Sequence, residues 1–214
     1  MLTSVLTIVG AMVVWAALHS LTAANWFKDL AAELLGKQAA RRYYRLLYNV
    51  VSGVTFLPVM AVVALLPDRG IYVLPTWALF ITVPIQLAAL VLLAITVIQV
   101  DVWHFIGLRQ LGETAADRKA RGTSADRSTA QLVVTGMYAW VRHPLYTLSL
   151  VVLWLAPIMT VNALTFNLMV TLYFYIGSMF EERKLVREYG EVYVAHQRKV
   201  PRLFPIPPGW QRER

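Results

Sequence analysis

The stretch that decides the fold reads LYTLSLVVLWLAPIMTVNALTFNLMVTLYFYIGSMF, residues 145–180, and contains no charged side chain. It follows Arg142-His143-Pro144 and precedes Glu181-Glu182. Asn162 lies near its middle and divides it into arms of about 18 residues, each about 27 Å long as a helix and close to the hydrocarbon thickness of a bilayer. The sequence therefore predicts a helical hairpin over 144–180 that returns to the membrane surface from which it starts.

The composition is that of a membrane protein. The chain has 214 residues, of which 58% are hydrophobic and only 15% are charged, and its net charge is +8. A soluble domain of this size is less apolar. The absence of cysteine excludes disulfides, Cys-ligated zinc, iron–sulfur clusters and a thiol nucleophile. The basic residues lie in connections between apolar spans, so we expect membrane lipids and not nucleic acid as partners.

The apolar spans predict an all-α, polytopic integral membrane protein. Five transmembrane helices are expected: about 2–24, 46–66 and 73–100, and the two arms of the C-terminal helical hairpin. The N-terminus lacks the features of a cleaved signal, so the first helix is expected to be retained. An apolar stripe over 183–197 predicts a cytoplasmic amphipathic helix. We expect a single membrane domain over 1–214, with three spans in 1–100, a cytoplasmic connection in 101–143, the hairpin in 144–180 and a cytoplasmic tail in 181–214.

The distribution of positive charge predicts the orientation. With five spans, Arg69 is the only one of the 20 Lys and Arg residues in a connection that faces the other side from the tail. Positively charged connections face the cytoplasm. The sequence therefore predicts an inner-membrane protein with its N-terminus outside and its C-terminus and site in the cytoplasm.

The hairpin brings Arg142, His143 and Tyr146 beside Glu181 and Glu182 where lipid meets water. An arginine beside two carboxylates can be a purely structural network. Ionisable groups at membrane depth more often mark a functional site. Arg142 and the exposed N–H groups at the start of the hairpin suit a carboxylate, and the glutamates suit an ammonium group or ribose hydroxyls. S-adenosylmethionine (SAM) presents all of these groups.

Three blocks of this region resemble a known family. The first block is Gly136-Met137-Tyr138 with Arg142-His143-Pro144-Leu145-Tyr146, the second is Glu181-Glu182-Arg183 with Tyr189-Gly190 and Tyr193, and the third is Val200-Pro201-Arg202-Leu203-Phe204-Pro205. All three are similar to the membrane SAM-dependent methyltransferases, which include isoprenylcysteine carboxyl methyltransferase and phospholipid methyltransferases. The resemblance implies SAM bound near the cytoplasmic surface and a lipophilic substrate that enters between helices. It assigns cofactor binding to Gly136, Tyr138, Arg142, His143, Pro144, Tyr146, Glu181, Glu182 and Arg202.

The N-terminal part is similar to one branch of that family. Four blocks carry this similarity: Ala17-Leu18-His19-Ser20, Tyr44-Arg45-Leu46-Leu47-Tyr48-Asn49, Phe105-Ile106-Gly107-Leu108-Arg109-Gln110, and Trp154 through Pro157-Ile158-Met159-Thr160. They resemble bacterial methanethiol S-methyltransferase-type proteins. Thr147 departs from the pattern, because many relatives carry glycine directly after the motif tyrosine. The resemblance favours a small or lipophilic thiol as the methyl acceptor. His19, Tyr44, Arg45, Tyr48 and Arg109 are candidates for the substrate entrance, although His19 is first expected to hydrogen-bond within the helix bundle.

Methyl transfer from a sulfonium is an in-line displacement, so alignment and exclusion of water carry most of the catalysis. Arg142, His143 and Glu182 are the candidate catalytic residues. A thiol or amine acceptor must lose its proton, and His143 or one of the two glutamates is the candidate base. A carboxylate acceptor needs no base. His143 can alternatively orient the glutamates.

Two other functions fit the same sequence. One is methylation of a phospholipid amine or an isoprenylcysteine-like carboxylate, and the other is a membrane scaffold without enzymatic activity. No metal is expected, because Asp101 and His104 lack further clustered ligands. The sequence does not predict the oligomeric state.

Overall fold

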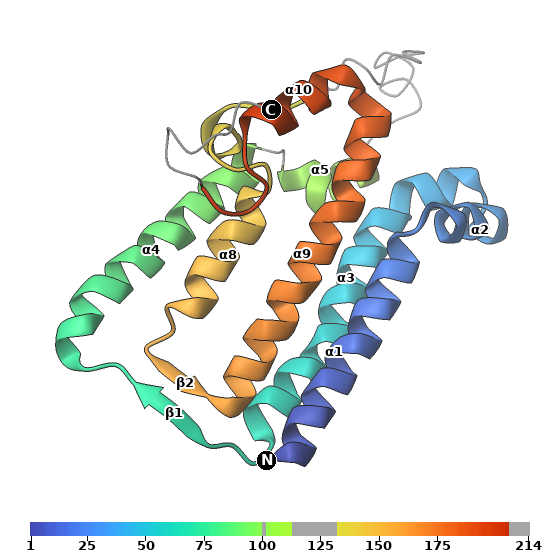
Figure 1. The fold of residues 1–214 in the computed structure, drawn as a ribbon. Helices are drawn as coiled ribbons and strands as arrows, with labels where there is room; N and C mark the ends of the chain where they lie inside the picture. Colours follow the sequence, from blue (N-terminus) through green and yellow to red (C-terminus); the bar gives the residue numbers. More distant parts are fainter. Residues whose placement is uncertain (100–101, 113–131, 206–214) are drawn as a thin grey trace. The chain divides into compact units, whose positions relative to one another are not determined.

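The structure is a computed structural model, and it describes residues 1–99, 102–112 and 132–205 (Figure 1). Within these residues the protein is an all-α membrane protein apart from one short two-stranded sheet. Four of the described helices are long and apolar enough to cross a membrane, and they are α1 (Leu2–Ala23), α3 (Lys37–Leu65), α4 (Thr76–Gln99) and α9 (Val161–Tyr189). The fifth span and the membrane-crossing hairpin stay predictions.

The chain divides into two compact units. The first consists of the described residues of Met1–Val73, Asp101–Arg118 and Ile158–Met169, and the second of those of Leu74–Val100, Lys119–Pro157 and Val170–Arg214. The helix α9 contributes its first turns to unit 1 and its remainder to unit 2. The single domain expected over 1–214 stays a prediction.

Unit 1 is built on the pair α1 and α3. Ile8 and Met12 of α1 are buried, and the indole Nε1 of Trp15 donates a hydrogen bond to the carbonyl oxygen of Ser52 in α3, at 3.1 Å. The amphipathic helix α2 (Asn25–Leu35) packs against both. Two short helices, α5 (Val102–Ile106) and α6 (Arg109–Gly112), pack against α3. A hydrogen bond of 2.9 Å from Asn49 Nδ2 to the carbonyl of Ile106 ties α3 to α5.

A small sheet closes one end of unit 1. Strand β1 (Gly70–Val73) pairs antiparallel with β2 (Ile158–Thr160), with Tyr72 opposite Met159 and Val73 opposite Ile158. The fully buried Asn162 then donates from Nδ2 to the carbonyls of Val63 and Leu66, at 3.3 and 3.1 Å. Carbonyls at a helix C-terminus lack intrahelical partners, so Asn162 caps the end of α3 from the start of α9.

Asp68 caps the start of α9, where that helix meets the end of α3. Its Oδ1 accepts hydrogen bonds from the backbone N–H groups of Asn162, at 3.0 Å, and Arg69, at 2.7 Å. Loss of some hydration acts to raise the pKa of the exposed Asp68, but these hydrogen bonds and that of Thr160 outweigh it, so the pKa is lowered. A carboxylate at the first turn of α9 also interacts favourably with the helix dipole.

Unit 2 contains α4, the 3-10 helix η2 (Gly136–Ala139), α8 (Pro144–Trp154), most of α9, and α10 (Glu191–Lys199). Figure 1 shows α4 beside α8, and Gln86 Nε2 donates to the carbonyl of Val152 at 2.9 Å across this contact. The ring of Tyr146 stacks on that of Phe174 at 4.5 Å, and Trp154 Nε1 donates to Thr171 Oγ1 at 3.0 Å. Residues that follow one another along α8 thus meet residues in reverse order along α9, so the two helices run antiparallel.

Helix α8 is shorter than the predicted arm. It has 11 residues, which rise about 17 Å against a hydrocarbon core of about 30 Å. The chain then turns into extended structure, because Ala156 precedes Pro157 and a residue before proline disfavours the helical conformation. The carbonyl of Pro157 accepts a hydrogen bond of 2.8 Å from the N–H of Leu74, which fixes this extended path.

Two other helix boundaries differ from the sequence prediction. Helix α3 begins at Lys37, well before the predicted membrane segment at 46, because residues 37–45 are good helix formers that continue the same helix outside the apolar region. The surface helix predicted over 183–197 is wrong as one element. Helix α9 continues to Tyr189, Gly190 breaks it with φ 57, and α10 follows.

Candidate functional site

The site lies in unit 2, where the start of α8, the end of α9 and the tail meet. In the chain, the site residues follow the 3-10 helix η2, whose first residue, Gly136, has φ 61. A Cβ atom at that position would lie 2.9 Å from the side chain of Gln99. Glycine is favoured there by the backbone conformation, since the end of the flexible Gln99 side chain could move away from a Cβ atom. Tyr138 follows, half-buried, and its pKa is raised by burial and by the negative charge of Glu181.

Backbone hydrogen bonds join two of the sequence blocks directly. The N–H of Arg142 donates to the carbonyl of Pro201 at 2.9 Å, and the N–H of His143 donates to that of Arg202 at 3.1 Å. The buried Pro144 follows as the first residue of α8, a position where its missing N–H costs nothing. Thr147 Oγ1 donates to the carbonyl of Leu203 at 2.5 Å, so the residue that departs from the family pattern helps to hold the tail.

The side chain of Arg142 ties three elements together. Its Nε donates to Glu182 Oε1 on α9 at 2.7 Å, and its Nη1 donates to the carbonyl of Gln197 in α10 at 2.9 Å and to that of Val200. Only 9% of the side chain is exposed. The free carbonyls at the C-terminus of α10 suit a cation, and Arg142 is therefore held as an internal clamp.

Glu182 is the centre of the cluster. It is 4% exposed, and both of its oxygens have partners. Besides Arg142, Oε1 lies 3.3 Å from His143 Nε2, while Oε2 accepts from Gln197 Nε2 at 3.1 Å and lies 3.3 Å from Arg202 Nη2. A buried carboxylate is tolerated only when paired and hydrogen-bonded, and here two guanidinium groups and an imidazole surround it.

His143 lies between the two glutamates. Its Nδ1 is 3.3 Å from Glu181 Oε2, its Nε2 is 3.3 Å from Glu182 Oε1, and its ring stacks on that of Tyr146 at 5.5 Å. Burial alone would lower the pKa of His143, but the hydrogen bonds and charges of Glu181 and Glu182 outweigh it and raise the pKa. The arrangement therefore favours the imidazolium form of His143, in which each ring nitrogen faces a carboxylate oxygen.

Glu181 is the accessible member of the pair. Its side chain is 47% exposed, and Tyr146 Oη donates to its Oε2 at 3.2 Å. Tyr146 is itself held by stacking between His143 and Phe174. The two adjacent glutamates thus have different environments, since one is buried among cations and the other is open to solvent.

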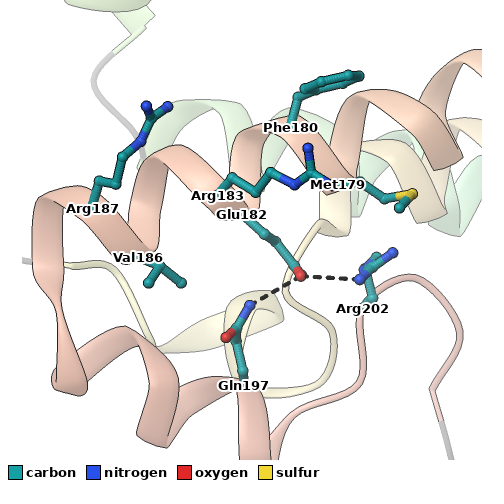
Figure 2. Close-up of a pocket in the computed structure, with 8 residues that line it drawn as sticks. All are labelled: Met179, Phe180, Glu182, Arg183, Val186, Arg187, Gln197 and Arg202. Atoms are coloured by element: carbon teal, nitrogen blue, oxygen red, sulfur yellow. Dashed lines mark hydrogen bonds and ion pairs between the residues drawn. The ribbon is translucent and has the colours of Figure 1, made fainter.

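A pocket of about 630 Å³ adjoins Glu182 (Figure 2). Figure 2 shows Glu182 pointing from α9 toward Gln197 and Arg202. Arg202 is 31% exposed at its side chain, and its buried Nε has no hydrogen-bond partner among the described residues. The pocket is lined by Met179, Phe180, Glu182, Arg183, Val186, Arg187, Gln197 and Arg202.

The sequence did not single out several of these residues. Met179, Arg183 and Val186 lie at helical spacing with Glu182 on α9, a signal that could have found the wall of the pocket once the helix was extended past Phe180. Gln197 gave no such signal, because its contact with Glu182 depends on the break at Gly190. Tyr193 is buried in α10, and burial together with the charge of Glu182 raises its pKa to about 12.

The candidate entrance residues lie in unit 1. The prediction that His19 hydrogen-bonds within the bundle is confirmed, because its ring lies 2.7 Å from Tyr48 Oη and 2.9 Å from Ser52 Oγ. Tyr44 donates to the carbonyl of Thr22. Arg45 lies where Gly107 approaches the backbone of α3, and Arg109 begins α6. Their role at an entrance stays a prediction.

Asp101 lies outside the described residues, as does the side chain of His104, so the structure does not describe that pair. Among the residues that it does describe, no group of three His, Cys, Asp or Glu side chains is arranged to hold a metal ion.

Comparison with known proteins confirms the resemblance to methanethiol S-methyltransferases. The chain is 26% identical over 204 residues to methanethiol S-methyltransferase 1 of Bradyrhizobium diazoefficiens, which covers 94% of this chain and 65% of that protein. It is 44% identical over 69 residues to the methanethiol S-methyltransferase of Crocosphaera subtropica, or 32% of this chain and 27% of that protein. With the enzyme of Mycobacterium tuberculosis the identity is 38% over 71 residues, covering 33% and 29%.

The chain thus spans less than two thirds of the length of each of these relatives. No family model matches it. No solved structure matches it either.

Proposed function

We propose that this chain is an integral membrane methyltransferase that transfers a methyl group from SAM to a small or lipophilic thiol. The observation that carries the proposal is the cluster in which Arg142, His143, Arg202 and Gln197 surround Glu182 beside a pocket. The relatives named methanethiol S-methyltransferase support the reaction and the thiol acceptor.

The donor groups around the pocket fit the polar parts of SAM. The partnerless Nε and the partial exposure of Arg202 make it the group that would receive the carboxylate. The exposed carboxylate of Glu181 would accept from the ammonium group or the ribose hydroxyls. Met179 and Val186 supply an apolar wall. The Nε and Nη1 groups of Arg142 donate within the protein, so we propose that Arg142 positions Glu182 and the tail instead of binding SAM itself.

When bound, SAM supplies an electrophilic methyl carbon on a positively charged sulfur. Held by Arg202 and Glu181, SAM would supply this methyl group to the acceptor sulfur and would leave as a neutral thioether. The chain's part is to align the two sulfurs with the carbon and to keep water away. The fixed position of Glu182, which has partners on α8, α10 and the tail, provides the rigidity that alignment needs.

The acceptor thiol must lose its proton before or during transfer, because the thiolate is the nucleophile. His143 is a poor acceptor for that proton, since its pKa is raised and both ring nitrogens face carboxylates. We propose that His143 orients the glutamates. The thiol proton passes to water, since the side of the cluster at Glu181 is open to solvent.

We further propose the arrangement in the membrane that the charges predict. The four long apolar helices cross the inner membrane, and α8 with the extended residues after it forms the fifth crossing. The N-terminus then lies outside, and the connection 101–143, the tail and the cluster lie in the cytoplasm, because Arg69 alone of the 20 positive residues lies in a connection on the other side.

The acceptor class is tested with the purified chain in nanodiscs, isotopically labelled SAM, and three kinds of acceptor: methanethiol and longer alkanethiols, a phospholipid amine, and a prenylcysteine. We expect labelled thioether from the thiols alone. Label in the lipid amine or in a methyl ester would move the acceptor to the second class. Binding of SAM without transfer to any acceptor would contradict the thiol assignment, and a folded chain that neither binds nor transfers would support a scaffold.

A further inference from the structure

Helix α2 is amphipathic, with an apolar side and a polar side. Its large apolar residues are Trp26, Phe27, Leu30, Leu34 and Leu35, its alanines are Ala31 and Ala32, and its polar residues are Asn25, Lys28, Asp29 and Glu33. At 100° per residue the large apolar side chains and Ala31 occupy one half of the helix, and the four polar side chains and Ala32 occupy the other.

Only part of the apolar half is used for packing within unit 1. Phe27 and Ala31 are partly buried, on the side where α2 meets α1 and α3. The adjoining stripe is exposed: Trp26 at 57%, Leu30 at 42% and Leu34 at 76%. In the described part of the chain, nothing covers this stripe, and three large apolar residues in a row on one helix face are unusual for a surface that meets water.

The exposed stripe lies on a helix that connects two candidate membrane-spanning helices. Helix α2 begins where α1 ends at the extended residue Ala24, and it ends at Gly36, directly before α3. Figure 1 shows it at the shared end of these two helices, turned away from their axes. On α1 the last turns expose Leu18 and Leu21, both 49% exposed. Since α1 and α3 are long and apolar enough to cross a membrane, α2 connects the ends of two candidate membrane-spanning helices.

Positive charge follows immediately after α2. Lys37, Arg41 and Arg42 lie exposed on the first turns of α3. Arginine and lysine near the end of a membrane-crossing helix extend toward the phosphate level of the bilayer. Asp29 and Glu33 lie on the opposite edge of the exposed face of α2, where they would meet water.

We propose that α2 is a membrane-docking helix that lies in the plane of a bilayer surface rich in anionic phospholipid. Trp26, Leu30 and Leu34 insert about 5–10 Å into the boundary between headgroups and acyl chains, as interfacial amphipathic helices do. Lys37, Arg41 and Arg42 contact the phosphate groups, and Asp29 and Glu33 face the water. This surface is separate from the residues proposed for methyl transfer and does not depend on that function.

The absence of cysteine from the chain makes a direct test possible. Single-cysteine variants Leu30→Cys and Leu34→Cys, with Asp29→Cys and Glu33→Cys as matched controls on the polar edge of the same helix, are spin-labelled in nanodiscs of phosphatidylcholine and phosphatidylglycerol. The ratio of collision with oxygen, which concentrates in lipid, to collision with a water-soluble nickel chelate reports depth. We expect this ratio to be at least about threefold higher at positions 30 and 34 than at 29 and 33.

Equal access of the nickel chelate to all four positions would overturn the proposal, because the stripe would then face water. Protection of positions 30 and 34 from both reagents would overturn it as well, because a protein surface would then cover the stripe. The role of anionic lipid is tested by omitting phosphatidylglycerol, which should reduce the ratio at 30 and 34 toward that of the controls. An unchanged ratio would contradict the contact of Lys37, Arg41 and Arg42 with phosphate.

A second measurement does not depend on cysteine variants. Tryptophan fluorescence of the full chain is recorded in nanodiscs whose lipids carry bromine close to the headgroup, and again with Trp26→Phe. The quenched component should be smaller in the variant, since one shallow tryptophan is removed. An identical quenched component in both proteins would place Trp26 away from the lipid and contradict the proposal.

Discussion

Glu182 is the residue whose contacts decide how the cluster holds together. It joins α9 to the side chains of Arg142, His143, Gln197 and Arg202, which come from the start of α8, α10 and the tail. Removing its charge leaves Arg142 buried without a carboxylate partner and leaves His143 with Glu181 alone, which is costlier than losing the pair itself. The tail and α8 then lose their shared contact on α9.

We therefore expect Glu182→Gln to lower the free energy of unfolding by about 3 kcal/mol. Glu188→Gln is the matched control, because Glu188 lies on the same helix and is exposed. The thermal unfolding midpoint of both variants in detergent measures the difference. A midpoint for Glu182→Gln that equals that of Glu188→Gln would show that the cluster does not stabilise the fold.

The raised pKa of His143 predicts a distinct dependence of stability on pH. A histidine with a raised pKa in the folded state contributes stability that is complete below its ordinary pKa of 6.5 and is lost as pH rises through the raised value. The stability difference between the chain and His143→Asn should therefore shrink as pH rises above 6.5.

His196 supplies a control of opposite sign. Burial and the charge of Arg142 lower its pKa, so the folded state resists its protonation. The stability difference between the chain and His196→Asn should grow as pH rises through 6.5. Unfolding midpoints of the three proteins across pH 5 to 9 compare the two slopes, and slopes of the same sign would contradict the assigned environment of His143.

At the scale of single residues the sequence predicted the meeting of Arg142, His143 and Tyr146 with Glu181 and Glu182, because a hairpin of two equal arms must return to its start. It did not predict that Arg142 Nη1 would donate to the carbonyls of Gln197 and Val200, nor that Gln197 Nε2 would donate to Glu182. Both depend on the path of the tail, which local periodicity does not encode.

At the scale of elements, the sequence predicted where apolar helices lie better than where they end. Hydropathy marks the part of a helix that suits lipid, whereas the helix continues as long as its residues favour it, as α3 does back to Lys37. The pairing of β1 with β2 was missed, since a three-residue strand leaves no periodic pattern. The shortening of α8 carried a readable signal in Pro157.

Gly190 and Gly107 both have a positive φ, but only Gly107 also lacks space for a side chain. Gly190 has φ 57 and open space around it, whereas Gly107 has φ 98 and a Cβ there would lie 2.6 Å from the backbone nitrogen of Leu46. Alanine at either position costs about 1 kcal/mol for the backbone conformation. At Gly107 the clash with α3 adds about 1–3 kcal/mol.

We therefore expect Gly107→Ala to lower the unfolding midpoint clearly more than Gly190→Ala. Thermal unfolding in detergent, followed by circular dichroism, measures both variants under one condition. Equal effects of the two substitutions would mean that the approach of Gly107 to the backbone of α3 is not tight.

At the scale of the whole molecule, composition predicted the class of protein, and the four long apolar helices agree with it. The number of crossings and the orientation still rest on charge and helix length, because α8 has only 11 residues. The methyl acceptor could not be predicted from apolar walls, since these resemble any membrane-facing helix.

The central claim is that the cluster around Glu182 and its pocket hold a methyl donor, and calorimetric titration of the purified chain with SAM tests it most directly. We predict saturable binding that Arg202→Gln weakens about tenfold or more, as expected for the loss of a charge-assisted hydrogen bond. Arg198→Gln, which removes the same charge from an exposed position on α10, should bind as the parent does. A folded chain that shows no binding of SAM, or equal binding by both variants, would contradict the account.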